Sequence, residues 1–324
     1  MLDVYSRVPS LQDAQMARRT RMTEKKLINM ISAGYGQGHG ENYRPWLKNT
    51  RSAISKIGTQ SSGRVLYGLK RSCDFKSRQE KKIARALLWL GAVDIREQFP
   101  LWPWPHAHPL VGAPGASQLV LRDAPGLLDL AEKAAIPHGV FVGTDLPYVA
   151  TTDFMVTVQR KHVPDLIAIA CKDREIVLND DRLSRPLERL ELERLYSNHI
   201  KIRHVVVDGE VFGNELLANL DWLMPDEQVV AELIKNPHLG EFHDRLNEKA
   251  FSISIDEAIE DARHHFGWTR KLGCSAFRYF TWMQELDIDL TQPLLMTQPA
   301  LAGGARIRSL LQRELFGEVD HAGP

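Results

Sequence analysis

Two apolar stretches of the sequence carry ionisable residues where a buried strand would not normally hold them. In "TTDFMVTVQRKHVPDLIAIACK", residues 151–172, Asp153 lies within the first run and Lys172 ends the second. An ionised carboxylate on a half-buried strand is costly unless it is paired or bound to a cation. A second acid, Glu80, lies upstream in a segment with helical spacing. Two carboxylates and a lysine are the groups that metal-assisted phosphodiester hydrolysis requires.

In such a site the carboxylates of Glu80 and Asp153 would hold Mg²⁺ through oxygen. Lys172 would orient the attacking water or help to deprotonate it, and would offset the developing charge. The same residues also fit a purely structural interpretation, in which Asp153 and Lys172 form a buried ion pair and Glu80 caps its helix. The residues alone leave both interpretations open.

The helix that carries Glu80 is predicted over residues 77–92. Ser77 is a suitable N-cap, and Glu80 three residues later completes a capping box. Ile83 and Ala84 lie one turn after Glu80 and therefore share its face.

A strand is predicted next, over residues 93–101. Its alternation places five side chains on one side: Val93, Ile95, Glu97, Phe99 and Leu101. Glu97 could therefore support a nearby metal site or pair with a lysine. Residues 102–147 are rich in Pro, Gly and Trp and are interpreted as an insertion or long loops.

Residues 148–158 and 163–172 are predicted to form two strands joined by a charged turn. If they form a hairpin, the ends that carry Asp153 and Lys172 meet at one edge of the sheet, and a helix bearing Glu80 can face them. A helix at 186–199 and a strand at 201–212 follow. This order of elements indicates an α/β or α+β domain ending near residue 225, with helical segments beyond it.

Several other residues of the sequence have alternative interpretations. Glu188 and Glu191 could reach a metal or lie on a solvated helix face. The "HAH" at 106–108 is a weak metal motif. The Gly-rich "GYGQGHG" at 34–40 is expected to be a flexible loop, and because no strand–helix phosphate pattern follows it, we predict no nucleotide site there. The aromatic residues Tyr43 and Trp46 could stack on DNA or dock this segment onto the core.

Charge is unevenly distributed along the 324 residues, although the formal net charge is zero. The first 82 residues contain about 17 Lys or Arg against about 6 Asp or Glu, which suits a polyanionic partner or simply a solvated basic surface. The three cysteines are far apart and show no metal-ligand spacing. No apolar run is long enough to span a bilayer, and the sequence has no signal-peptide core. We therefore expect a cytoplasmic protein with no membrane partner.

The sequence resembles the TnsA-type endonuclease subunit of heteromeric transposases. "SRQEKKIARALLWLGAVDIREQFPL" (77–101) is similar to the opening of that family, in which a helix with a catalytic Glu leads into a strand. "TTDFMV" (151–156) and "AIACK" (168–172) resemble its acidic motif and its Lys-ending strand. "LERLELERLYSNHIKIRHVVVDGEVF" (187–212) is similar to its next helix and strand. "DARHHFGWTRKLGCSAFRYFTWMQELDIDLTQPL" (261–294) resembles its helix-turn-helix-like region. The similarity covers roughly residues 70–100 and 148–295.

The resemblance implies an α/β nuclease domain of the type II restriction-endonuclease fold, followed by a helical, winged-helix-like C-terminal domain. We place a basic N-terminal arm at 1–65, the nuclease domain at 66–224 and the C-terminal domain with its tail at 225–324. The implied activity is Mg²⁺-dependent cleavage of the 5′ ends of a transposon, with Mn²⁺ able to substitute. The implied partners are transposon-end DNA, a DDE-type transposase subunit and an ATPase regulator.

Transferred by position, the resemblance makes Glu80, Asp153 and Lys172 the catalytic residues, with Glu80 and Asp153 as metal ligands. Family members usually have Gln two residues before the Lys, whereas this chain has Ala170, so the backbone carbonyl of Cys171 is expected to supply an oxygen instead. This departure leaves the number of metals open. It also keeps open a non-catalytic DNA-binding or assembly subunit, and a stand-alone restriction or repair nuclease is a third possibility.

Overall fold

The computed structural model describes residues 21–48, 61–172, 185–208 and 210–317. The α-helices are α2 (Glu24–Ser32), α3 (Arg78–Trp89), α4 (Leu127–Lys133), α6 (Arg185–His199), α7 (Asn214–Leu223), α8 (Glu227–Leu233), α9 (Leu239–Lys249), α10 (Ile255–His265), α11 (Arg270–Met283) and α12 (Gly304–Phe316). The strands are β1 (Ser61–Val65), β2 (Ser72–Phe75), β3 (Asp94–Leu101), β4 (Ala150–Arg160), β5 (Val163–Cys171) and β6 (Arg203–Val207), with short 3₁₀ turns η1 (Gly40–Asn42) and η3 (Ala116–Gln118). The α/β class predicted from the sequence is confirmed.

The central sheet has the strand order β3-β4-β5-β6. Strands β3, β4 and β5 are antiparallel, and β6 runs parallel to β5. The predicted hairpin is confirmed: β4 and β5 are joined by Lys161 and His162, which both have positive φ (48° and 70°) as a two-residue hairpin turn requires. Strand β6 ends at Val207, earlier than predicted, because the Asp208 side chain accepts the N–H groups of Glu210 and Val211 and turns the chain.

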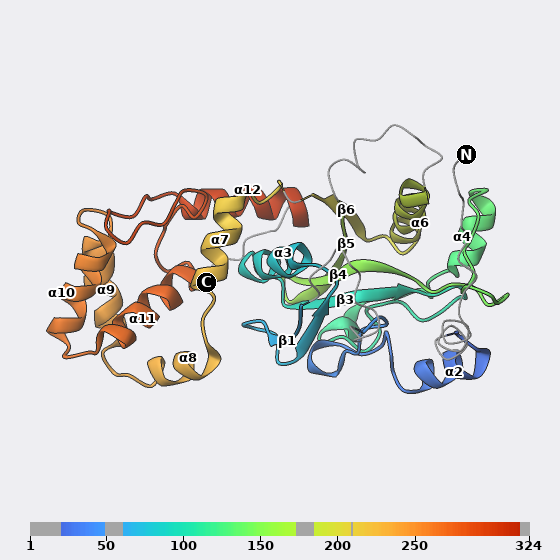
Figure 1. Cartoon of the computed structure of the whole chain (residues 1–324), viewed down its shortest axis with the longest axis horizontal. Helices are drawn as coiled ribbons and strands as arrows, with labels where there is room; N and C mark the ends of the chain where they lie inside the picture. The colour runs from blue at the N-terminus through green and yellow to red at the C-terminus, as the bar shows by residue number, and fades with distance from the viewer. Residues whose placement is uncertain (1–20, 49–60, 173–184, 209, 318–324) are drawn as a thin grey trace, which may run out of the picture.

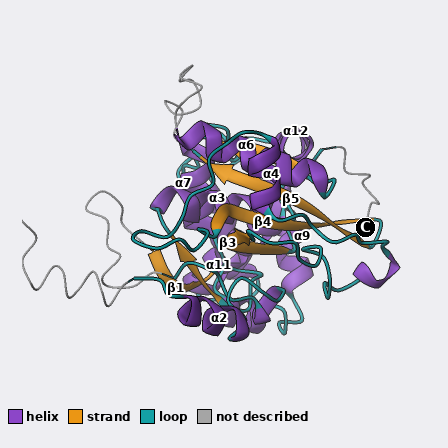
Figure 2. Ribbon diagram, turned by 90° about the vertical axis from the view of Figure 1, so that its right-hand side faces the viewer, coloured by secondary structure: helices purple, strands orange, loops and turns teal. Residues whose placement is uncertain are grey.

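Helices cover both faces of this sheet (Figure 1). On one face, α3 packs its Ile83 and Leu87 against Phe154 and Ile169, in a core that continues into α7 and the C-terminal helices. On the other face, residues of α4 and α6 form a second core with Met155 and other residues of the sheet. Each fully buried apolar side chain contributes about 1.5–3 kcal/mol relative to exposure, so the two cores hold the strand ends firmly. Figure 2 shows the sheet enclosed between the helices in a view at right angles.

The prediction of a single apolar side for residues 93–101 was wrong. Gln98, in the middle of β3, has a φ of 49°, which reverses the alternation of the side chains. Ile95 consequently belongs to the core on the α3 face, whereas Phe99 and Leu101 belong to the core on the α6 face. Val93 precedes the strand and is 49% exposed.

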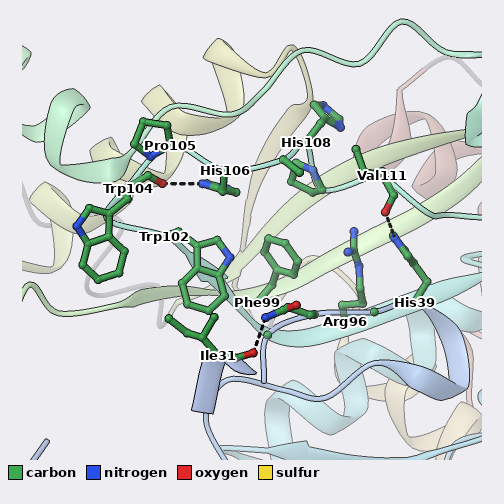
Figure 3. A pocket seen from close by; sticks show the side chains of 15 residues that line it. Ile31, His39, Arg96, Phe99, Trp102, Trp104, Pro105, His106, His108 and Val111 are labelled. Atoms are coloured by element: carbon green, nitrogen blue, oxygen red, sulfur yellow. Dashed lines mark hydrogen bonds between the residues drawn. The ribbon is translucent and has the colours of Figure 1, made fainter. Parts of the chain in front are cut away.

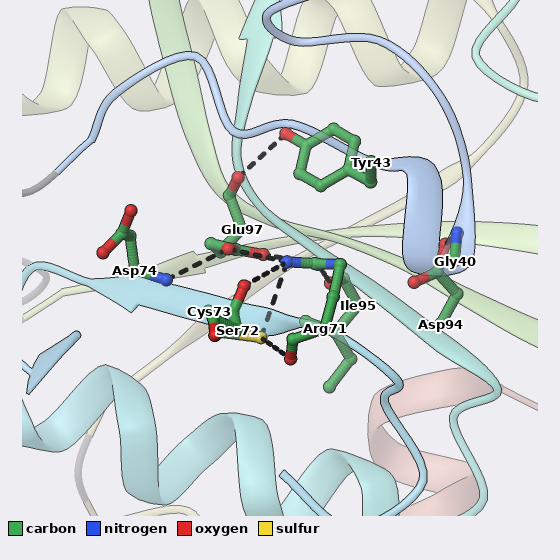
Figure 4. Close-up of polar contacts among 9 residues, drawn as sticks. All are labelled: Gly40, Tyr43, Arg71, Ser72, Cys73, Asp74, Asp94, Ile95 and Glu97. Atoms are coloured by element: carbon green, nitrogen blue, oxygen red, sulfur yellow. Dashed lines mark hydrogen bonds and ion pairs between the residues drawn. The ribbon is translucent and has the colours of Figure 1, made fainter. Parts of the chain in front are cut away.

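Glu97 of β3 forms a buried ion pair with Arg71 rather than with a lysine or a metal. The guanidinium donates to both carboxylate oxygens, at 2.8 and 2.6 Å, and to the carbonyl of Ile95 (Figure 4). The backbone N–H of Asp74 also donates to Glu97, and the Tyr43 hydroxyl donates to its backbone carbonyl. This network joins the chain around β2 to β3 and to the N-terminal segment.

The described part of the N-terminal segment is docked on the core. Tyr43 and Trp46 are 3% and 2% exposed, and Trp46 packs edge-on against Trp102. The docking interpretation of these aromatic residues is therefore confirmed. Gly36 has a φ of 74°, and a Cβ there would lie 2.4 Å from the Pro100 ring, so the glycine lets the loop approach β3 closely.

Helices of the C-terminal region anchor the end of α3. The side-chain amides of Gln284 and Gln312 donate to the carbonyls of Trp89 and Leu90, which close the last turn of α3. α12 folds back against the protein, with Leu315 buried in the core of the α3 face. Within the described ranges, no helix combines the length and the apolar character needed to cross a bilayer.

Candidate functional site

Helix α3 places Glu80 at its first turn, facing the sheet. The Ser77 hydroxyl accepts the backbone N–H of Glu80 at 3.0 Å, as predicted for the N-cap. The Glu80 carboxylate, however, accepts the N–H of Lys76 at 2.8 Å instead of that of Ser77, so the predicted capping box is shifted by one residue. Glu80 is 8% exposed and shares a buried face with Ile83 and Ala84, as predicted.

The end of the β4–β5 ladder brings Asp153 and Lys172 together. The last residue pair of the ladder is Phe154 with Ile169, and beyond it the Asp153 side chain takes the place of a strand partner. Its Oδ2 accepts the backbone N–H of Cys171 at 2.7 Å and the Lys172 ammonium at 2.9 Å. The backbone N–H of Lys172 donates to Val207 of β6 at 3.0 Å, which fixes the lysine at the sheet edge.

The Lys172 ammonium also donates to the carbonyl of Cys171, at 3.1 Å. A positive charge therefore already bridges one carboxylate oxygen and one backbone carbonyl of the site. Oxygen donors of this kind suit a hard divalent cation, so the donor set fits Mg²⁺. The Cys171 thiol takes no part as an anion, since burial, with Asp153 next, raises its pKa well above the usual value.

The charges of the two acids interact. Burial, followed by the negative charge of Asp153, raises the pKa of Glu80 to about 7. For Lys172, burial lowers the pKa, but the carboxylates of Asp153 and Glu193 outweigh burial and leave the pKa above its usual value. At neutral pH the lysine is therefore positively charged, while Glu80 is partly protonated.

A cavity of about 520 Å³ opens beside these residues, between the start of α3, the end of β5 and the chain leading into α7. Glu80, Cys171 and Lys172 line it. Asp153 lies behind this lining and contacts two of its residues, Cys171 and Lys172. The structure thus brings all four predicted site residues to one edge of the sheet.

Glu193 of α6 was not predicted from the sequence. It is 6% exposed, its Oε2 has no hydrogen-bond partner among the described residues, and its charge raises the pKa of Lys172. The two acids weighed instead, Glu188 and Glu191, pair with arginines of their own helix. Helical spacing could have indicated it, because Glu193 lies three residues before Tyr196 and therefore on the same, buried face of α6.

The "HAH" motif is not a metal site. His106 bonds to the Trp104 carbonyl and the Tyr196 hydroxyl, and the ring of His108 accepts the N–H of Leu110. In the part of the chain that the structure describes, no group of three or more His, Cys, Asp or Glu side chains is arranged to hold a metal. The candidate site therefore depends on two carboxylates and a carbonyl.

Comparison with known proteins identifies the family of the chain. No protein-family model matches the chain. The chain is 31% identical over 220 residues to the transposon Tn7 transposition protein TnsA of Escherichia coli, a match that covers 65% of this chain and 67% of that protein. The chain belongs to the TnsA family.

This TnsA-family chain has Ala170 where the resemblance leads one to expect a glutamine. Ala170 is fully buried and offers no donor side chain. The next oxygen along β5 is the backbone carbonyl of Cys171, which accepts a hydrogen bond from the Lys172 ammonium.

Proposed function

We propose that this TnsA-family chain is the DNA endonuclease subunit of a heteromeric transposase and cleaves the 5′ ends of the transposon. The observation that carries the proposal is the convergence of Glu80, Asp153 and Lys172 at one sheet edge, beside a cavity. A hydrolytic phosphodiester site needs oxygen ligands for a metal and a fixed positive charge, and these residues supply both. The order of α3, three antiparallel strands, α6 and β6 supports assigning residues 66–224 to the type II restriction-endonuclease fold.

Glu80, Asp153 and the Cys171 carbonyl would hold Mg²⁺, with Mn²⁺ able to substitute. When bound, the metal would polarise the scissile phosphate and lower the pKa of a coordinated water. Two features support a cation at this position: the raised pKa of Glu80, and the Lys172 ammonium already bridging Asp153 and Cys171.

In this proposal, Lys172 acts as a charge and not as a base. Its raised pKa keeps it protonated, so it orients the attacking water and offsets the charge that develops on the phosphate. The charge of Glu193 also stabilises the charged form of the lysine. Asp153 positions the lysine through the 2.9 Å contact.

The proposed partners follow from the same assignment. Transposon-end DNA is the substrate, a DDE-type transposase subunit cuts and joins the 3′ ends, and an ATPase regulator controls assembly. A free non-specific nuclease would be toxic, so partners are expected to complete the site. We propose that this cleavage takes place in the cytoplasm, where the DNA is found.

The test is cleavage of a supercoiled donor plasmid by the full chain with its partner transposase and Mg²⁺. We expect Asp153→Asn to abolish 5′ nicks at the element ends. Asp165→Asn is the matched control, because Asp165 also pairs with a cation, Arg160, but at the far end of the same hairpin. If Asp153→Asn cuts as the control does, the catalytic assignment is wrong.

A non-catalytic assembly and DNA-binding subunit is the competing proposal, and it is favoured by Ala170. It predicts that Glu80→Gln leaves all transposition products unchanged and that Mn²⁺ soaked into crystals finds no ordered position. A stand-alone nuclease would instead cut DNA without any partner.

A further inference from the structure

A second cavity, of about 430 Å³, lies between the N-terminal loop, β3 and the chain that follows it. Figure 3 shows side chains from these three segments pointing into the same space. Its walls include Phe99, Trp102, Trp104 and the loop around His39. A cavity of this size, with mainly apolar walls and three large aromatic side chains, is typical of small-ligand sites. The Gly-rich stretch that was expected to be a flexible loop forms one of these walls.

The cavity contains a buried arginine without a hydrogen-bond partner. Arg96 lines it, is 2% exposed, and forms no hydrogen bond or ion pair with any residue that the structure describes. Its guanidinium lies 4.6 Å from the centre of the Phe99 ring, and burial lowers its pKa in spite of the charge of Asp94. A buried guanidinium with free N–H groups is costly, and an acceptor-bearing ligand would remove that cost.

The histidines that line the cavity already have hydrogen-bond partners. His39 bonds to the Val111 carbonyl at 2.9 Å, and His106 bonds to Trp104 and Tyr196. Burial lowers the pKa of His39 and His106, so both are neutral at neutral pH. Among the described residues that line the cavity, Arg96 is therefore the charged one.

The aromatic residues favour a flat ligand. Trp104 is 41% exposed at the rim, and Trp102 is held in place by its edge-on contact with Trp46. Stacking on such rings and hydrogen bonding to a planar guanidinium fork together recognise a planar ring with acceptor atoms along one edge. Nucleobases have this chemistry.

The cavity lies close to the proposed catalytic edge. Arg96 is directly opposite Met155 in the β3–β4 ladder, and Asp153 is two residues along β4 on the same side. In a ladder, such diagonal neighbours have their backbones about 7–8 Å apart, which places Arg96 and Asp153 at adjoining positions of the sheet. A base next to the scissile phosphate could therefore enter this cavity.

We propose that the cavity binds one unpaired base of the DNA strand beside the cleavage point, with the base against the indoles and its acceptor edge toward Arg96. The proposal rests on the proposed function, since it takes DNA as the substrate. It adds a base-reading position to a cleavage site and requires the end of the duplex to open there.

The test measures binding without cleavage, in EDTA, with the full chain. The probes are two duplexes, one with 2-aminopurine in a single-stranded overhang and one with the same base paired inside the duplex. We expect quenching of the overhang base on binding and little change for the paired base. Trp104→Ala should weaken overhang binding about 5- to 140-fold. Trp222→Ala is the matched control, because Trp222 is 44% exposed on α7, outside the cavity.

Further variants separate the possible outcomes. Arg96→Met should also weaken overhang binding, and Trp104→Ala carries the test if the buried substitution prevents folding. Cleavage is scored with Asp153→Asn and base binding with Trp104→Ala, so loss of cleavage and loss of base binding are distinguishable. Equal binding by Trp104→Ala and Trp222→Ala would overturn the proposal. So would equal affinity for the paired base, or a free nucleoside monophosphate that binds as tightly as the overhang.

Discussion

Replacing Glu80 by Gln tests the electrostatics of the candidate site directly. The structure gives Glu80 a raised pKa of about 7, against an ordinary value of 4.5, chiefly because the carboxylate is buried and then because Asp153 is near. Gln keeps the shape and can still accept the N–H of Lys76, but it cannot ionise. The comparison therefore isolates the cost of the charge.

The sign and size of the effect follow from the two pKa values. Between pH 4.5 and about 7 the folded chain holds a proton on Glu80 that the unfolded chain releases. The contribution of protonated Glu80 to the free energy of unfolding is fully present below pH 4.5 and is lost as the pH rises to about 7. A difference of about 2.5 pKa units corresponds to about 3 kcal/mol. Relative to wild type, Glu80→Gln should gain about 3 kcal/mol of unfolding free energy between about pH 4 and about pH 8.

The assay is urea unfolding of both proteins in EDTA across this pH range. The half-buried histidines His39 and His106 have lowered pKa values and stabilise the fold as the pH rises, but they are common to both proteins and cancel in the difference. Glu257→Gln is the control, because Glu257 holds the same third position in an exposed capping box on α10, with its pKa lowered by Ser254. Its effect should have the opposite sign, a loss of stability toward neutral pH. A Glu80→Gln difference that stays flat with pH would refute the reasoning.

Three further substitutions test the packing around the site, each by chemical denaturation. Arg71→Met should cost about 3–5 kcal/mol, because it leaves the fully buried Glu97 without its partner; a cost below about 1 kcal/mol would contradict this. Gly36→Ala should cost about 1–3 kcal/mol, because of its positive φ and the close β3 ring, and unchanged stability would mean that the loop can move away. Gln312→Ala should cost about 1–3 kcal/mol, because it leaves the buried carbonyl of Leu90 without a donor; unchanged stability would mean that a water molecule replaces the Gln312 amide.

The sequence was sufficient to predict those parts of the site that depend on local rules. Ser77 and Glu80 follow N-cap chemistry, and the alternation around Asp153 and Lys172 predicts strands and their faces. Their meeting at one edge followed from the hairpin. These predictions needed no knowledge of distant contacts.

The parts that were missed depend on contacts between distant segments. The left-handed conformation of Gln98 has no signal in its residue type, so the change of face along β3 could not be read from the alternation. Arg96 is an unremarkable residue of a strand until a loop some 60 residues earlier and another chain segment enclose it. Predicting Glu193 required locating the buried face of α6 from Tyr196, whereas the sequence drew attention to the more exposed Glu188 and Glu191.

The charge balance of the site couples metal binding to proton release in the proposed mechanism. Without a metal, Lys172 neutralises Asp153, and the raised pKa lets Glu80 remain partly protonated at neutral pH. A divalent cation held by Glu80, Asp153 and the Cys171 carbonyl would favour the ionised form of Glu80 and compete with the lysine for that carbonyl. The lysine would keep its charge, because Asp153 and Glu193 both stabilise it, and would be directed toward the cavity. Metal affinity should therefore rise with pH through the pKa of Glu80, and Glu80→Gln should remove that dependence.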